Sequence, residues 1–384
     1  MTPLWQKMIE DVPKNRDFAL ECLDNAAENA RKTGFVSPER VQKIKEYTAI
    51  IRNDQDELEN FFNAFYIFAN GVEDEIFNEP FPAEFGRKCG EKQFLLVLAM
   101  SLIPVAEATF KKLGIPVVKL HETYDEIEAW IGNCERNYGV TGLEYIHGFA
   151  WIVIRLFTAQ VIRFSRLEYN RCKVPDDIVI YCNKKSGEKC VLMNKETDFN
   201  AAGLIAVSDE KIEFTAKLQK GDDGSVTGFK VQKNGIVEKT PVTLLPDEWE
   251  LYLTPGDNAI FMHIPEVGPL KIDDVLDSYR MVQEFYKEYY PDYQLKVILS
   301  HSWLFDPVLP TLMPDTSNIC RYQQTGHVFP RKGPSDAIRR VFGQPAVDNG
   351  VESVEWKSSL QKTLGNYITS GGVCRGGGIL IFID

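Results

Sequence analysis

The pattern of apolar positions changes near residue 165 of this 384-residue chain. Before that point, apolar residues recur every three to four positions, which places them along one face of an α-helix. The clearest start is Ser37-Pro38, a predicted N-cap followed by proline at the first helical position. After residue 165, short alternating runs are separated by turn residues, as is typical of β-strands. The pattern therefore predicts a helical first half and a mixed α/β second half.

The last helix of the first half is predicted over residues 143–164, where apolar residues occupy most sides. A helix that is apolar all round is usually buried, so we expect this one to be central. The second half opens with an antiparallel meander. Its turns are predicted at residues 221–224 and at Asn234-Gly235, because Asx-Gly pairs between alternating segments favour hairpins.

A strand–helix–strand unit organises the second half. Strands are predicted at residues 259–264 and 295–300, with a helix over 272–290 between them. At this length the connection predicts two parallel strands, whose carboxyl ends lie at the same edge of a sheet. His263 and His301 fall at those two ends. Ligands of open α/β sheets bind at such edges, which makes both histidines candidate site residues.

A glycine-rich segment around Arg375 leads into a strand over residues 379–383. No helix follows these glycines, so they lack the helix N-terminus that would favour phosphate binding. We interpret the segment as a turn before an edge strand.

Length and composition predict two domains, 1–164 and 165–384, with a globular balance of 44% hydrophobic and 26% charged residues. A formal net charge of -12 argues against a nucleic-acid partner, because phosphate binding needs a basic patch. The N-terminus lacks a signal-peptide pattern, and the run Phe94–Ile103 is about half the length needed to cross a bilayer. Membrane association is therefore not expected.

The spacing of cysteines and histidines, and the absence of several known motifs, exclude some classes of function. Eight cysteines without C-x-x-C spacing predict reduced thiols and a cytoplasmic location. Five histidines without H-x-H or H-x-x-x-H spacing predict no metal site. The chain also lacks a P-loop, a dinucleotide-binding loop and the G-x-S-x-G elbow of serine hydrolases. For His263, two interpretations stay open: a structural core histidine, or a base for proton removal from an amine or hydroxyl.

The stretch Met262–Leu270, the helix after it, and the stretches Ser300–Pro307 and Pro314–Ile319 together resemble a known family. They are similar to the C-terminal domain of bacterial two-domain N-acyltransferases. In that family a helical N-terminal domain precedes a GNAT-like α/β domain. The resemblance implies an α+β two-domain fold, all-helical in domain 1–164 and built on a central twisted sheet in domain 165–384.

The resemblance also implies a reaction: transfer of an acyl group from an acyl-CoA thioester, the co-substrate, to an amine or similar small-molecule nucleophile. The attack would be direct. His263 or His301 would serve as general base, and Ser302 as proton donor to the departing thiolate. The resemblance places the acyl carrier on the strand ending at His263 and on the following loop, at Ile264, Val267, Gly268, Leu270 and Lys271. Substrate contacts are expected from Glu266, Trp303 and Arg321.

The loop over residues 266–271 departs from the usual glycine-rich loop of that superfamily. It has one glycine, Pro269 lacks an N–H, and Glu266 would repel phosphate. A second hypothesis is therefore a non-catalytic protein that binds a small ligand and keeps the GNAT-like fold without a working coenzyme A site. An ester hydrolase ranks third, since no nucleophile elbow is present. The acyl group, the acceptor and the oligomeric state are left open by the sequence.

Overall fold

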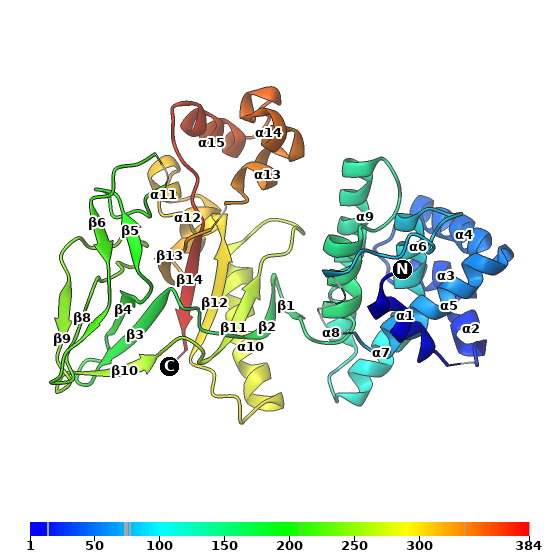
Figure 1. Ribbon diagram of the computed structural model, residues 1–384, viewed down its shortest axis with the longest axis horizontal. Helices are drawn as coiled ribbons and strands as arrows, with labels where there is room; N and C mark the ends of the chain where they lie inside the picture. The colour runs from blue at the N-terminus through cyan, green and yellow to red at the C-terminus, as the bar shows by residue number, and fades with distance from the viewer. Residues whose placement is uncertain (14, 73–75, 77, 208, 334, 384) are drawn as a thin grey trace. The chain divides into compact units, whose positions relative to one another are not determined.

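The computed structural model describes residues 1–13, 15–72, 76, 78–207, 209–333 and 335–383 (Figure 1). The chain divides into two compact units. Unit 1 comprises Met1–Asn170 with Ile264–Pro269, and unit 2 comprises Arg171–His263 with Leu270–Asp384. Helices fill unit 1, whereas unit 2 is mixed, which confirms the predicted α+β class. The domain limit after residue 164 stays a prediction.

Unit 1 is a bundle of helices followed by a short hairpin strand. Ser37 caps α4 as expected: its side chain accepts a hydrogen bond from the N–H of Arg40, and Pro38 opens the helix. The elements are α1 (Pro3–Glu10), α2 (Asp17–Asp24), α3 (Ala26–Lys32), α4 (Pro38–Asn53), α5 (Gln55–Ala69), α6 (Glu91–Ser101), α7 (Ile103–Lys112), α8 (Val118–His121), α9 (Asp125–Tyr138), the π-type segments η2 (Tyr145–Phe149) and η3 (Trp151–Leu156), and β1 (Ile162–Phe164).

The central helix of unit 1 is α6, not the predicted helix over 143–164. Every residue of α6 from Phe94 to Ser101 is buried. The 143–164 segment forms η2 and η3 and then turns into β1 through Ala159, which has a left-handed φ of 58°. A continuous apolar run fits a buried helix and a buried strand equally well, and this explains the error. No single described helix is long and apolar enough to span a membrane; α6 and α7 meet that test only as a pair bent by 41°.

A buried arginine anchors the β1 hairpin within unit 1. Arg163 lies opposite Glu168 across the hairpin and donates to it over 3.1 Å. Its other nitrogens donate to Glu126, over 2.6 Å, and to Asp125. Burial, and then the charge of Glu126, raise the pKa of Glu168 well above its ordinary value. The cluster therefore holds one buried cation among three acidic side chains.

The described strands of unit 2 belong to four sheets, the largest of which also includes β1 and the start of β2 from unit 1. The largest has the strand order β1-β2-β11-β12-β14-β13, and the limit between the units falls inside β2, after Asn170. The smaller sheets are β10-β3-β4, β7-β8-β9 and β5-β6. The strands are β2 (Leu167–Lys173), β3 (Ile178–Asn183), β4 (Lys189–Met193), β5 (Thr197–Phe199), β6 (Phe214–Ala216), β7 (Gln219–Lys220), β8 (Val226–Gly228), β9 (Val242–Leu244), β10 (Trp249–Leu253), β11 (Asn258–His263), β12 (Val297–Ser302), β13 (His327–Pro330) and β14 (Gly377–Phe382).

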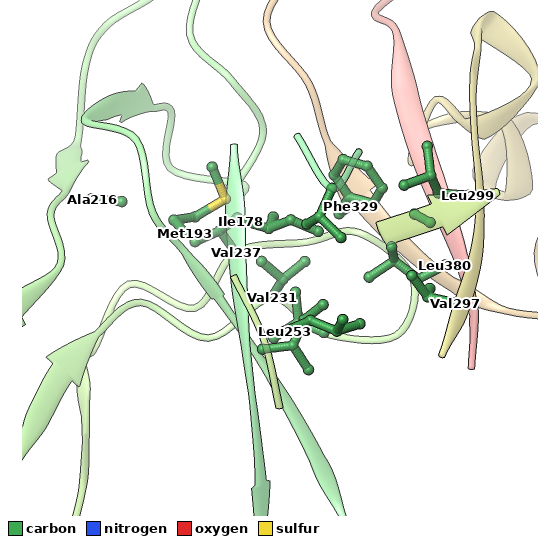
Figure 2. Close-up of a cluster of buried hydrophobic side chains, with 14 of the residues drawn as sticks. Ile178, Met193, Ala216, Val231, Val237, Leu253, Val297, Leu299, Phe329 and Leu380 are labelled. Atoms are coloured by element: carbon green, nitrogen blue, oxygen red, sulfur yellow. The ribbon is translucent and has the colours of Figure 1, made fainter. Parts of the chain in front are cut away.

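The core of unit 2 lies between the large sheet and the meander. Val297, Leu299 and Leu380 of the large sheet pack against Ile178 and Met193 of β3 and β4 (Figure 2). Because side chains alternate along a strand, the odd-numbered residues of β11 and β12 face the meander and the even-numbered ones face the other way. This alternation places both candidate histidines on the meander side of the sheet.

Helices complete unit 2. The helix α10 joins β11 to β12, while α13, α14 and α15, which precede β14 in the sequence, lie together (Figure 1). These helices and short turns are α10 (Ile272–Tyr289), η4 (Trp303–Phe305), α11 (Leu309–Leu312), α12 (Asn318–Gln323), α13 (Ala337–Phe342), α14 (Gln344–Asn349), η5 (Val351–Ser353) and α15 (Ser359–Thr369).

The edge strand predicted over residues 379–383 is wrong, because β14 lies between β12 and β13. Its first two residues are glycines for steric reasons. A Cβ on Gly377 would lie 2.2 Å from the carbonyl oxygen of Phe305, and one on Gly378 would lie 2.2 Å from the ring of Phe329. Both positions therefore need glycine for close packing, not for a turn.

Candidate functional site

The parallel strands β11 and β12 part at their carboxyl ends. Their register joins Ile260 with Ile298 and Phe261 with Leu299, and no further pair continues this ladder among the described residues. On its other side β12 stays paired with β14 as far as Ser302, which lies opposite Gly377. The expected parallel pair is present, and its two strands diverge before either histidine is reached.

Both imidazoles pack against one phenylalanine ring. The ring of Phe261 has its centre 4.7 Å from that of His263 and 5.3 Å from that of His301. The ring of Phe329, on β13, adds a second edge contact to His301 at 5.8 Å. The two histidines, which the sequence could place only on the same edge, thus flank one aromatic side chain.

An arginine that the sequence did not suggest contacts His301. The guanidinium of Arg331, which directly follows β13, donates to Nδ1 of His301. The other ring nitrogen, Nε2, is buried and has no hydrogen-bond partner among the described residues. Arg331 also places its Nε 3.8 Å from a carboxylate oxygen of Asp177. Burial raises the pKa of Asp177, while the charge of Arg331 acts in the opposite direction.

Ser302 and Trp303 are both engaged in local structure. The Ser302 hydroxyl oxygen accepts a hydrogen bond from the N–H of Leu304 over 3.2 Å, which caps the turn η4. This bond uses a lone pair and leaves the hydroxyl proton for another acceptor. Ser302 faces the side of the sheet opposite to His301. Trp303 packs against the buried cluster of Leu309 and the C-terminal helices.

The loop after β11 is contacted by a cation other than its own Lys271. Arg166, in the tight turn between β1 and β2, donates from Nε to the carbonyl of Pro269 and from a terminal nitrogen to that of Gly268, each over 3.2 Å. The preceding Ser165 has a left-handed φ of 54°, which costs a non-glycine residue free energy. A strained turn thus holds a guanidinium against the loop within unit 1.

The remaining predicted contacts lie along and after this loop. Gly268 has a φ of 63°, and Lys271 is the N-cap residue of α10 without a side-chain cap bond. Among the predicted contacts on this loop, Glu266, Gly268 and Lys271 are exposed, and Ile264, Val267 and Leu270 are half-buried.

Arg321 lies on α12, where its exposed side chain complements the negative end of a short helix. Among the described residues, no group of three or more His, Cys, Asp or Glu side chains could hold a metal ion.

Sequence reasoning missed Phe261, Arg331 and Gly378. The register pairs His301 with Gly378, and Gly378 with Phe329, so the glycine leaves room between the imidazole and the phenyl ring. Strand alternation alone could have suggested Phe261, which lies two residues before His263 on the same face. Nothing in the local sequence links Arg331 to a histidine thirty residues earlier.

Comparisons with known proteins agree with this architecture. A sequence model of the family described as GNAT-like C-terminal domain matches residues 161–380. An acyltransferase solved in complex with decanoyl-CoA is 16% identical, with 99% of each chain covered and a TM-score of 0.57. A mutant acyltransferase in complex with octanoyl-CoA is 15% identical, covering 99% of this chain and 95% of that chain, with a TM-score of 0.59.

A third solved structure, an acyltransferase in complex with decanoyl-CoA and teicoplanin, is 15% identical, covering 98% of this chain and 94% of that chain, with a TM-score of 0.57. No curated protein matches this chain significantly. The matches confirm the resemblance of the C-terminal half to a GNAT-like domain and extend the fold similarity over the helical half.

Proposed function

Because the chain belongs to the family defined by the GNAT-like C-terminal domain, we propose that it transfers an acyl group from an acyl-CoA thioester to an amine or similar small-molecule nucleophile. The observation that carries this proposal is the divergence of β11 and β12 beside two imidazoles. Solved acyltransferases of similar fold hold decanoyl-CoA and octanoyl-CoA, which supports the choice of co-substrate.

Diverging parallel strands suit the long arm of an acyl carrier. Beyond Phe261 and Leu299, β11 and β12 no longer bond each other. An extended molecule with amide groups can hydrogen-bond to such a strand edge, as peptides do when they add to a sheet. The thioester would then lie between the strands, in the plane of the sheet, where side chains from both faces reach it.

The reaction needs positioning and proton transfer, without a covalent enzyme intermediate. The lone pair of the acceptor nitrogen attacks the thioester carbonyl carbon, and the C=O π electrons move onto oxygen. When this intermediate collapses, the C–S bond breaks and the thiolate of coenzyme A departs. The nitrogen proton goes to His263 or His301, and Ser302 supplies a proton to the thiolate while it takes one up from water, so that the hydroxyl is restored. These roles are our assignment.

The positive charge of Arg166 offsets the repulsion that Glu266 would exert on phosphate at this loop. Arg166 brings a guanidinium to the carbonyls of Gly268 and Pro269. Its Nε and one terminal nitrogen are bonded to these carbonyls, so the guanidinium would act on phosphate through its positive charge. This arrangement supports carrier phosphates at the loop after β11, despite its single glycine.

The proposal includes the setting in which the protein acts. All eight cysteines are free thiols, which fits a reducing cytoplasm. A net charge of -12 does not favour nucleic acid, so the expected partners are small molecules.

The proposal is tested by calorimetric titration of the purified chain with acetyl-, octanoyl- and decanoyl-CoA, followed by an assay of thiol release with a panel of amines. We expect binding of at least one thioester and amine-dependent release of free coenzyme A. His263→Ala should slow this release by about 10²- to 10⁴-fold. The matched control is His121→Gln, which changes an exposed histidine bonded to Glu107 in unit 1. It should leave turnover unchanged.

The results of these assays distinguish the proposed acyltransferase from a non-catalytic binding protein. If no thioester binds, the proposed function is wrong. If a thioester binds but no amine promotes thiol release, the chain is better described as a binding protein that keeps the GNAT-like fold.

A further inference from the structure

We propose that His301 is not the base of this reaction but a hydrogen-bond donor: its Nε2–H binds the carbonyl oxygen of the acyl thioester. Arg331 is the positioning residue that fixes the required tautomer. The base is then His263. This inference rests on the proposed acyl transfer. It gives different roles to His263 and His301, which sequence analysis could not distinguish.

The contact with Arg331 determines which ring nitrogen carries the proton. A guanidinium has five N–H donors and no acceptor, so it can bond only to a lone pair on His301. The contact is at Nδ1, which is therefore the unprotonated nitrogen. In a neutral imidazole the proton must then be on Nε2. One lone pair is engaged and the other nitrogen bears hydrogen, so His301 has no site that can take a proton from an acceptor.

The N–H donor at Nε2 of His301 is unsatisfied. The atom is buried and has no hydrogen-bond partner among the described residues. A buried donor without a partner costs free energy, and most such donors in folded proteins are satisfied. No acceptor in the described part of the chain meets this donor, and the proposal assigns that role to a group of the bound substrate.

The surroundings indicate what kind of group that is. His301 lies between the rings of Phe261 and Phe329, at 5.3 and 5.8 Å, and beside the side-chain-free Gly378. An acyl thioester combines an apolar chain with one carbonyl acceptor, which matches an aromatic environment in which Nε2 of His301 offers an unpaired donor. In apolar surroundings such a donor stabilises developing negative charge more strongly than it would in water.

The step balances with these assignments. As the acceptor nitrogen forms its bond to the carbonyl carbon, the π electron pair moves to the oxygen, which accepts the Nε2–H bond without taking the proton. His263 removes the proton from the nitrogen. The C=O bond re-forms as the C–S bond breaks, and the thiolate leaves with its electron pair. His301 ends the cycle in the tautomer in which it began.

The tautomer is measured first, because that result does not depend on any ligand. The full chain with ¹⁵N-labelled histidine is examined by long-range ¹H–¹⁵N NMR, and the His301 signals are assigned from their loss in His301→Phe. We expect a proton on Nε2 and none on Nδ1 between about pH 6 and pH 8. Arg331→Met should abolish this fixed pattern. An imidazolium, or a proton on Nδ1, in the unaltered protein overturns the proposal.

The donor role is measured with two unreactive analogues of octanoyl-CoA. One replaces the sulfur by CH₂ and keeps the carbonyl; the other is an S-alkyl thioether without the carbonyl. His301→Phe keeps the ring packing but removes the donor, and it should weaken the ketone analogue by about 3- to 10-fold while leaving the thioether unchanged. His301→Gln, which retains an N–H, should recover much of the affinity. Thermal unfolding of both variants checks that they fold.

Each outcome has one meaning. Equal effects on the two analogues, or none on the ketone, overturn the donor role while the proposed function stands. If neither analogue binds the unaltered protein, the proposed function fails together with the donor role, even where the tautomer is as expected.

Discussion

Two arginines near the same end of the large sheet have very different surroundings. Arg375 lies just before β14, and Arg331 just after β13, where Pro330 pairs with Gly377. The guanidinium of Arg375 donates to the carbonyls of Ile205 and Val373, over 2.9 and 3.2 Å, and to both carboxylate oxygens of Glu210. Its side chain is 8% exposed, and its bonds to Ile205 and Glu210 tie its own loop to a distant one.

The Arg331 side chain is 41% exposed and makes fewer interactions within the chain than Arg375 does. It donates to His301 and lies near Asp177, yet its histidine partner keeps a buried nitrogen without a bond among the described residues. Around Arg375, the side-chain donors and acceptors bond to one another within the chain. Beside Arg331, the Nε2 donor of His301 has no acceptor in the described part of the chain, and we assign that acceptor to a bound ligand. Mutation should therefore affect stability at Arg375 and ligand recognition at Arg331.

The largest effect on stability is expected from Arg375→Met. The substitution removes a cation from a mostly buried network and leaves the Glu210 carboxylate without its partner. We expect the free energy of unfolding to fall by about 2–3 kcal/mol, at or just below the lower end of the range for broken buried ion pairs, because Glu210 is partly exposed. Urea denaturation measures the change. A loss below about 1 kcal/mol would mean that the network contributes no more than a surface pair.

Gly378→Ala should have the next largest effect. Its new Cβ would lie 2.2 Å from the ring of Phe329, so either the ring or the strand must move. We expect a loss of about 1–3 kcal/mol in unfolding free energy, together with a change in the His301 environment. The matched control is Gly132→Ala on α9, where the nearest atom is 3.5 Å away. Alanine is the better helix former, so this control should gain up to about 1 kcal/mol.

Arg331→Met should change stability by less than about 1 kcal/mol, because the side chain is partly exposed. The same variant should lose affinity for the ketone analogue by about 3- to 10-fold. Denaturation and calorimetry on the same preparation provide both values. A large loss of stability with unchanged affinity would reverse the comparison and make Arg331 the structural residue of the two.

The smallest effect is a pH dependence. Burial raises the pKa of Asp177 above its ordinary 3.8, so the folded protein holds this proton more tightly than the unfolded chain. The resulting stability is fully present below that ordinary value and is lost as the pH rises through the raised pKa. Asp177→Asn cannot titrate and should show a flatter dependence in this window. Denaturation at several pH values compares the slopes, and an unchanged slope would refute the assignment.

Much of the fold follows from local patterns in the sequence. The unit formed by β11, α10 and β12 was predicted within a few residues, because the strand, helix and strand differ clearly in period and are separated by proline and glycine. The shared edge of His263 and His301 follows from the handedness and length of that connection. The family resemblance rests on the same segment.

The partners at the site could not be predicted in the same way. The contacts of His301 with Arg331, of Arg375 with Glu210, and of Arg166 with the loop carbonyls join segments far apart in the sequence. Such pairs are set by strand order, and no local period encodes that β14 lies between β12 and β13. The helix predicted over residues 143–164 was wrong for a different reason: the apolar run is unbroken, so the sequence gives no sign of the change from helix to strand.

The most direct test of the central claim is a crystal structure of the chain with the ketone analogue of octanoyl-CoA. The account predicts that its carbonyl lies between the carboxyl ends of β11 and β12, with the oxygen about 2.7–3.2 Å from Nε2 of His301. An analogue bound away from these strand ends, or a carbonyl that has no contact with His301 while Arg331 still holds Nδ1, would contradict it.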